Sequence, residues 1–166
     1  MLLFEIQLSY QKNNEQIRRL VGQEEQRWGT TIRKNGQIER RTVYMGNYES
    51  ITEGGVIREF YYLDGGVIII KQDGEFKPYL AFTDNLGSIL SVVDENGEKV
   101  FDASYDAWGC QTVTLNEIGL HRGYTGHEML NEFGIINMNA DHRVGSSDHS
   151  DFFELNVQNV EATPMN

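Results

Sequence analysis

The sequence predicts an all-β fold built mainly from consecutive antiparallel hairpins, and three observations support that prediction. The chain of 166 residues contains 17 glycines but only two prolines, which is typical of many tight turns and not of a proline-rich linker. Asn-Gly, Asp-Gly and Gly-Gly pairs punctuate its middle, and such pairs supply the positive φ angles of hairpin turns. The stretches between them are short and rich in Val, Ile, Thr, Tyr and Phe, which favour strands.

The clearest hairpin is expected between Gly87 and Tyr105. Residues 88–93 and 98–105 form its arms, and the turn has the sequence Asp-Glu-Asn-Gly at 94–97. On the returning arm, apolar residues alternate with polar ones, so one face is expected to be buried and the other to face water.

A second hairpin is predicted to turn at Asn35-Gly36, with residues 30–34 and 37–44 as its arms. These arms are largely polar, which favours a position towards solvent or at a sheet edge. Before them, alternating apolar residues indicate an opening strand, and the stretch 11–26 suits a helix about as well as a strand.

One short helix is predicted near residues 126–133. Thr125 and Glu128 have the spacing of a capping box, in which both side chains satisfy free backbone N–H groups. The apolar residues that follow would share one side of the helix, and Gly134 would end it.

The character of the chain changes after Asn139. Residues 141–151 are polar and rich in Ser, Asp and His, although apolar residues alternate once more beyond them. We therefore expect a hairpin-built region over residues 1–139, followed by a divergent tail, 140–166, that is poorly ordered or adds one loosely attached strand.

Charge and cysteine content exclude several classes of partner. The net charge is -11, from 14 basic and 25 acidic residues, so the chain has no general attraction to nucleic acid or anionic lipid. A single cysteine, Cys110, excludes an internal disulfide framework and a cysteine-based metal cluster.

No apolar run is long enough to span a membrane, and the N-terminus does not have the pattern of a signal peptide, so the localisation of this chain stays open.

Several long motifs give a more specific signal. Residues 79–90 read YLAFTDNLGSIL, residues 94–97 read DENG, residues 104–109 read SYDAWG, and residues 122–139 read RGYTGHEMLNEFGIINMN. In that order they resemble the core-associated region of the Rhs family, also called YD-repeat proteins, and weaker matches extend the resemblance to roughly residues 8–139.

The resemblance implies a function and a set of structural residues. In this family, Tyr-Asp hairpins wind into a long spiral sheet that closes into a hollow shell around a variable C-terminal segment, often a toxin used between bacteria. The parent proteins are secreted or lie at the cell surface. The positions that match the family motifs are Asp84, Leu86, Gly87, Tyr105, Asp106, Trp108, Gly109, Gly123, Tyr124, Thr125, Gly126, His127, Glu128, Phe133, Gly134, Asn137, Met138 and Asn139.

The chain also departs from the family pattern. The family continues after Met-Asn with Gly-Arg and with Asp-Pro motifs linked to self-cleavage, whereas here Asn139 is followed by Ala140 and no Asp-Pro pair occurs. We interpret the chain as a truncated or rearranged piece of such a shell, with open sheet edges that favour self-association or pairing with the rest of a parent shell.

The residue patterns indicate structural roles and not catalytic chemistry. Cys110 with His121 or His127 would make a thiol nucleophile and base, but no pattern of a cysteine hydrolase surrounds Cys110. The histidines and aspartates of residues 141–151 do not have the spacing of a metal site. We therefore expect no catalytic residue, no metal and no cofactor, with His127 as a hydrogen-bonded structural residue.

The leading hypothesis is thus a non-catalytic structural piece of an Rhs-type shell. The alternative is a surface carbohydrate-binding module, in which exposed aromatic rings stack on glycans. The candidate rings for that role are Tyr61, Tyr62, Tyr79 and Trp108.

Overall fold

Strands make up almost all regular structure in the computed structural model of this chain, which describes residues 6–12, 15–21, 27–138 and 141–144. Two short 3-10 turns are the other regular elements in those ranges, so the predicted all-β fold is confirmed. None of the helical turns found there has the length or apolarity to cross a membrane. The chain divides into two units, residues 1–57 with 153–166 and residues 58–152.

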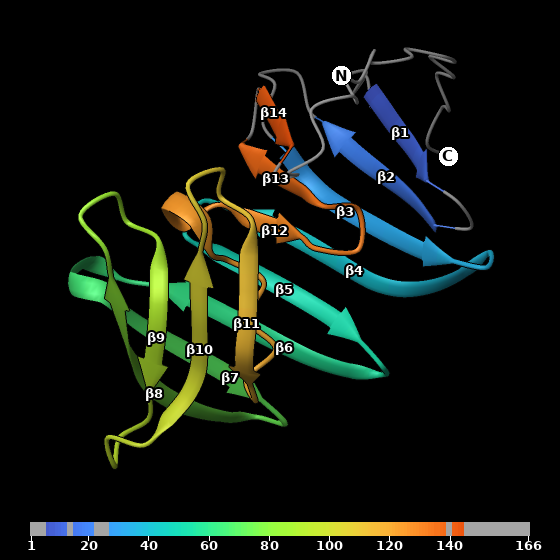
Figure 1. Ribbon diagram of the computed structural model, residues 1–166. Helices are drawn as coiled ribbons and strands as arrows, with labels where there is room; N and C mark the ends of the chain where they lie inside the picture. Colours follow the sequence, from blue (N-terminus) through green and yellow to red (C-terminus); the bar gives the residue numbers. More distant parts are fainter. Residues whose placement is uncertain (1–5, 13–14, 22–26, 139–140, 145–166) are drawn as a thin grey trace. The chain divides into compact units, whose positions relative to one another are not determined.

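In the first unit, five strands follow one another as antiparallel neighbours (Figure 1). They are β1 (Ile6–Lys12), β2 (Glu15–Val21), β3 (Arg27–Lys34), β4 (Gln37–Met45) and β5 (Tyr48–Glu53). Each strand pairs with the next one in the chain. The stretch 11–26, whose pattern suited helix and strand equally, therefore forms strand in its described parts.

The hairpin predicted at Asn35-Gly36 is present, and both turn residues have positive φ angles, of 51° and 79°. Its predicted position at a sheet edge is wrong, because β3 also pairs with β2 and β4 also pairs with β5. Its predicted orientation towards solvent holds for one face, where Arg41 and Val43 are exposed. Polarity misled the prediction, since Arg40 and Thr42 are buried. A guanidinium nitrogen of Arg40 lies 3.7 Å from a carboxylate oxygen of Glu53, and this opposite charge offsets part of the cost of burial.

The second unit begins within β6 (Val56–Tyr62) and repeats the hairpin pattern. The strands that follow are β7 (Val67–Gln72), β8 (Glu75–Thr83), β9 (Ile89–Val93), β10 (Lys99–Tyr105) and β11 (Gln111–Asn116). Each is antiparallel to its neighbour in the chain, and β9 with β10 forms the clearest predicted hairpin. A separate antiparallel sheet contains β12 (Glu128–Leu130), β13 (Ile135–Met138) and β14 (Asp141–Val144).

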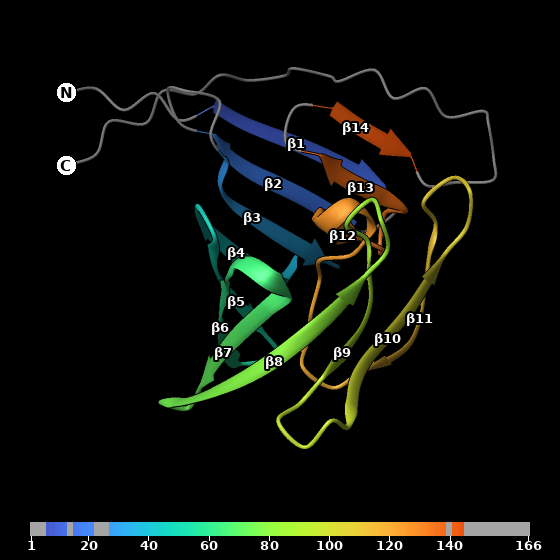
Figure 2. The ribbon, with the colours of Figure 1, turned by 90° about the vertical axis from the view of Figure 1, so that its left-hand side faces the viewer.

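The segment 117–127 leads from β11 to β12 within the second unit. In Figures 1 and 2 it runs back between β6–β7 on one side and β10–β11 on the other. Ile118 and Leu120 are buried there, at 7% and 2% exposure. The Arg122 guanidinium lies 4.1 Å from the ring centroid of Tyr62 in β6, a distance suited to a cation–π contact. The segment therefore fills the space inside the curved sheet with its own side chains.

The short helix predicted near residues 126–133 is wrong. Residues 124–126 form a single 3-10 turn, and β12 then runs through the predicted helix. Thr125 has a φ of 49°, and His127 is extended at φ -85° and ψ 159°, so the capping box does not form. Instead, the Glu128 carboxylate accepts a hydrogen bond from the Asn137 side-chain amide across β12 and β13, at 2.7 Å. Pairing between strands, which local spacing does not reveal, decides the conformation here.

The predicted tail, 140–166, is described only in part. Residues 141–144 form β14, which pairs with β13, although the sequence had indicated only a polar stretch there. The remainder of the tail lies outside the described residues.

Three turns of the second unit share the sequence Asp-x-x-Gly and one hydrogen-bond pattern. They begin at Asp84, Asp94 and Asp106. In each, one carboxylate oxygen accepts from the backbone amides two and four residues later, at 2.8–2.9 Å. The aspartate amide donates to the carbonyl four residues later, and the glycine amide donates to the aspartate carbonyl. The glycines have φ angles of 80–87°, a conformation that other residues adopt only with strain.

These carboxylates should make stability depend on pH in the acid range. The amides of Ser88 and Glu98 are the largest causes that hold the pKa of Asp84 and Asp94, respectively, below the ordinary value of 3.8. A carboxyl with a depressed folded-state pKa stabilises the fold above its unfolded-state pKa, and this contribution is lost as pH falls through the folded-state value. We expect Asp94→Ala to lower the urea midpoint near neutral pH, and the difference from the wild type to disappear in acid.

Glu95→Ala is the matched control, because it removes a carboxylate from the same turn without removing the acceptor of its amides. Urea unfolding of the two variants at several pH values is the measurement. Equal effects of both substitutions, or a pH-independent effect of Asp94→Ala, would contradict this account of the turn.

Candidate functional site

Three of the sequence motifs meet in the second unit around Tyr105. Its hydroxyl donates a hydrogen bond to the carbonyl of Ile89 at 2.8 Å and accepts one from the Gln111 side-chain amide at 3.0 Å. The Asn131 side-chain amide donates in turn to the Gln111 side chain at 2.9 Å. Tyr105 therefore ties β10 to both adjacent strands and, through Gln111, to the turn after β12.

Gly123 also packs against Tyr105 and its partners. Its carbonyl accepts from the Ile89 amide at 3.1 Å, so it contacts the same residue as Tyr105. A Cβ atom at Gly123 would lie 2.5 Å from the Gln111 side-chain nitrogen, 2.7 Å from the Tyr105 hydroxyl and 2.8 Å from the Cγ of Met129. Only glycine fits there without movement of its neighbours.

The turn at residues 123–127 repeats two backbone hydrogen bonds of the three aspartate turns without a carboxylate, and its backbone differs at Thr125. The Gly123 amide donates to the carbonyl of His127, and the Gly126 amide donates to the carbonyl of Gly123. Gly126 has a positive φ, of 72°, and the last glycine of each aspartate turn also has a positive φ. Gly123 stands where the others have aspartate, and the lack of space around it explains why no side chain occupies that position.

The Tyr124 ring packs against the motif that carries Tyr105. The two ring centroids lie 5.9 Å apart with the planes tilted by 57°. A Cβ atom at Gly109 would come within 3.3 Å of the Tyr124 ring and 2.9 Å of a methyl group of Ile136. The Gly109 of the YDAWG motif thus serves two purposes, since it also takes the positive φ of its turn.

Thr125 holds a strained conformation beside His127. A φ of 49° is unfavourable for a β-branched residue. The Thr125 amide donates to the hydroxyl of Ser88, which is fully buried, at 3.2 Å. The Thr125 hydroxyl lies 2.8 Å from Nδ1 of His127. These contacts fasten the turn to the start of β9 and give His127 a hydrogen-bonded position.

The remaining motif positions are distributed around this cluster. Phe133 is buried at 1% exposure, Gly134 ends the β12–β13 turn with a φ of 65°, and Asn137 is buried opposite Glu128. Met138 is the last residue of β13, and Asn139 lies outside the described residues. Gln111, Ser88, Met129 and Asn131 take part in the cluster although sequence reasoning did not single them out.

The aromatic rings proposed for glycan stacking are mostly covered. Trp108 is 59% exposed at a turn, whereas Tyr61, Tyr62 and Tyr79 are partly buried. The Tyr61 hydroxyl donates to Glu59 at 2.8 Å, and the Tyr62 face holds the Arg122 guanidinium. These four rings do not form an exposed row, which the carbohydrate-binding alternative required.

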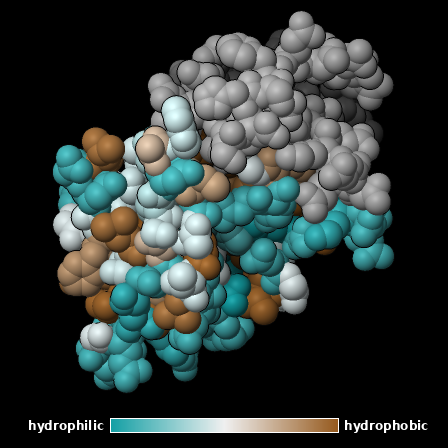
Figure 3. Space-filling view, in the orientation of Figure 1, coloured by the Kyte–Doolittle hydropathy of each residue, from teal (hydrophilic) through white to brown (hydrophobic). Residues whose placement is uncertain are grey.

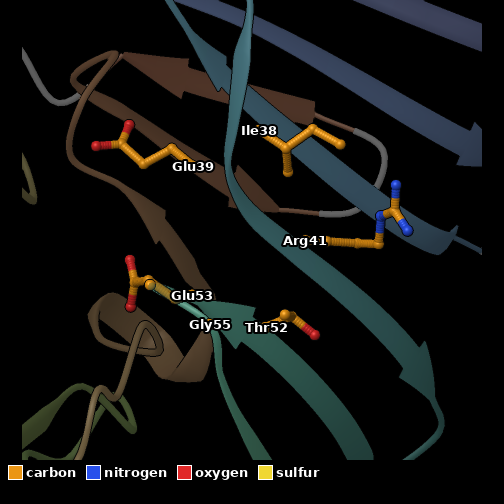
Figure 4. A pocket seen from close by; sticks show the side chains of 7 residues that line it. Ile38, Glu39, Arg41, Thr52, Glu53 and Gly55 are labelled. Carbon is orange, nitrogen blue, oxygen red and sulfur yellow. The ribbon is translucent and has the colours of Figure 1, made fainter.

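A pocket in the first unit is lined by residues of β4, the end of β5 and the turn after β5 (Figure 4). It has a volume of about 540 Å³ and is lined by Ile38, Glu39, Arg41, Thr52, Glu53, Gly54 and Gly55. None of these residues belongs to the motifs above. Among the described residues, no three His, Cys, Asp or Glu side chains gather closely enough to hold a metal ion. Cys110 is exposed at the end of its turn, where its amide donates to Asp106.

Gly123→Ala should destabilise the second unit by about 1–3 kcal/mol, because the added methyl group must displace packed neighbours. The Tyr105 hydroxyl is one of those neighbours. We therefore expect Gly123→Ala to lower the free energy of unfolding by less in a Tyr105→Phe background than in the wild type. A double-mutant cycle measured by urea unfolding tests this coupling. Strictly additive losses would show that the two positions are not in contact.

Burial raises the pKa of Tyr105 to about 12, the Gln111 hydrogen bond lowers it by a smaller amount, and the Asp84 charge raises it further. Since the folded state disfavours the ionised phenol, this contribution to stability is present below the ordinary pKa of 10.0 and is lost as pH rises towards 12. Spectrophotometric titration of the tyrosines should show a late step from Tyr105. Tyr105→Phe should remove that late step, and its persistence would contradict the assignment.

Comparison with known proteins gives a fold match without a sequence match. No family model and no curated protein matches the sequence. The crystal structure of TcdB2-TccC3 has a TM-score of 0.64 and 12% sequence identity, over 80% of this chain and 8% of that chain. The Photorhabdus luminescens Tc holotoxin pore with a mutant TccC3 has a TM-score of 0.63 and 13% identity, over 82% of this chain and 8% of that chain. This chain therefore shares its fold with a small part of much longer toxin proteins.

Proposed function

We propose that this chain is a non-catalytic structural piece of an Rhs-type (YD-repeat) shell. Its parent protein would enclose or deliver a C-terminal toxin in competition between bacteria. The observation that carries the proposal is the repeated Asp-x-x-Gly turn, which builds one hairpin after another with the same hydrogen bonds. A repeated unit that each time adds the next antiparallel strand is what a long spiral sheet requires.

The fold comparisons support the same role. Both matched structures contain TccC3 in a toxin complex, and this chain spans only 8% of the matched chains. A piece of that size encloses no cargo by itself, so the activity would belong to the parent assembly. The family-like motifs would then serve to hold the hairpins and the segment 117–127 together.

The contacts of the motif residues support a structural role and not a catalytic one. Tyr105 and Gly123 fill a packed junction, and Asp84 and Asp106 are occupied by the amides of their own turns. Glu128 is buried against Asn137 between two strands. In each case the polar group already has a partner that holds the fold.

Isolation of the chain tests the proposal through its oligomeric state. A piece of a larger shell should self-associate, because its sheet edges are left without the strands that the parent supplies. Size-exclusion chromatography with light scattering should show β-rich oligomers, and circular dichroism on the same peak distinguishes them from unfolded aggregates. The mass of the intact chain should also stay constant on prolonged incubation.

A compact monomer that unfolds cooperatively would contradict the proposal, since it would be an independent domain. A chain that cuts itself during incubation would contradict the non-catalytic part of it.

A further inference from the structure

The strand β11 presents an edge that is open to a partner. It is the last strand in the order of its sheet and, among the described residues, it pairs only with β10. Thr112, Val113, Thr114 and Asn116 are exposed along it. The exposure shows that the described part of the chain leaves these side chains uncovered.

The edge lacks charge and proline, two of the features that usually prevent strand addition. Proteins protect exposed edges with charged side chains, prolines or bulges that turn the edge away. β11 has the sequence QTVTLN, which contains neither a charge nor a proline. β11 does contain one bulge, because Thr114 has no opposite residue in β10. The pairs on either side of it remain antiparallel, so most of the edge keeps a regular extended backbone. Three of its six residues are β-branched, which suits an extended conformation.

Acidic residues lie at both ends of this uncharged edge. Asp106 is exposed in the turn that leads into β11, and Glu117 is exposed directly after its last residue. The nearby Asp102 is already paired with Lys99 at 2.9 Å. Charge thus favours a partner that carries basic residues at the ends of a short neutral strand.

We propose that β11 binds an extended polypeptide segment with basic residues at both ends, which adds to the sheet as a further strand. Backbone hydrogen bonds along the edge would supply affinity, and the flanking acids would select the partner. The proposal rests on the edge alone and does not depend on the role of the chain in a shell.

A second copy of β11 is a poorer partner for this edge on the same grounds, so self-association of the chain would use its other sheet edges. Antiparallel pairing of two copies brings Glu117 of each towards the Asp106 end of the other, and parallel pairing brings like acids together. Each chain also carries a net charge of -11. Both arrangements therefore place negative charges side by side, which lowers the affinity.

A synthetic peptide, Lys-Thr-Val-Thr-Val-Thr-Lys, provides the probe. Fluorescence anisotropy with the labelled peptide and the full chain should show binding roughly tenfold tighter than that of the same peptide with glutamates at both ends. Hydrogen exchange with the peptide in excess should slow at the amides of β11. The same peptide with alternate backbone nitrogens methylated cannot complete the pairing and should not bind.

Glu117→Lys should abolish the preference for the lysine peptide, and its side chain carries no contact of the Tyr105 cluster. Glu75→Lys is the matched control, because it makes the same charge change at an exposed position three strands away and should leave the preference intact. The proposal is overturned if the lysine peptide does not bind. It is also overturned if both peptides bind equally or if methylation has no effect.

Discussion

The aspartate carboxylate that accepts two backbone amides is the interaction on which the second unit depends. Each such turn reverses the chain in four residues. The carboxylate accepts hydrogen bonds from two backbone amides that would otherwise have no acceptor within the turn. The glycine at the end provides the positive φ that closes the ring of bonds. Because three turns repeat the same geometry, successive strands acquire a consistent direction and spacing. The pairing of successive strands then decides which apolar side chains are buried. Figure 3 shows that some apolar patches remain on the surface among hydrophilic residues.

The fold class followed from glycine-containing turns, because their conformational demand is local. Asn35-Gly36 and Asp94 to Gly97 could be assigned as turns without knowledge of the rest of the chain. The short helix failed for the opposite reason. Met129, Leu130 and Phe133 have the spacing of one helix face. Met129 and Leu130 nevertheless each pair with a residue of β13, so partners elsewhere in the chain decide their conformation.

The candidate site was predictable in its members but not in its geometry. The motif resemblance selected Tyr105, Gly123 and Tyr124, yet it did not show that they meet. The partners that complete the cluster, Gln111 and Ser88, have no distinctive sequence signal because an amide and a hydroxyl occur at many surface positions. At Gly123 the close approach of Gln111 and Tyr105 leaves no space for a side chain, and nothing in the neighbouring sequence indicates those contacts.

The segment 117–127 has a consequence for the order in which the chain folds. Arg122 contacts Tyr62, which precedes it by sixty positions, whereas each hairpin joins residues that are close in the chain. Local pairings form before distant ones, because closing a long loop costs more entropy. During synthesis the hairpins of β6–β11 would form as they emerge, but their inner face stays unfilled until residues 118 and 120 arrive. The second unit therefore passes through a stage with an exposed apolar interior, and that interval is when it is most prone to aggregate.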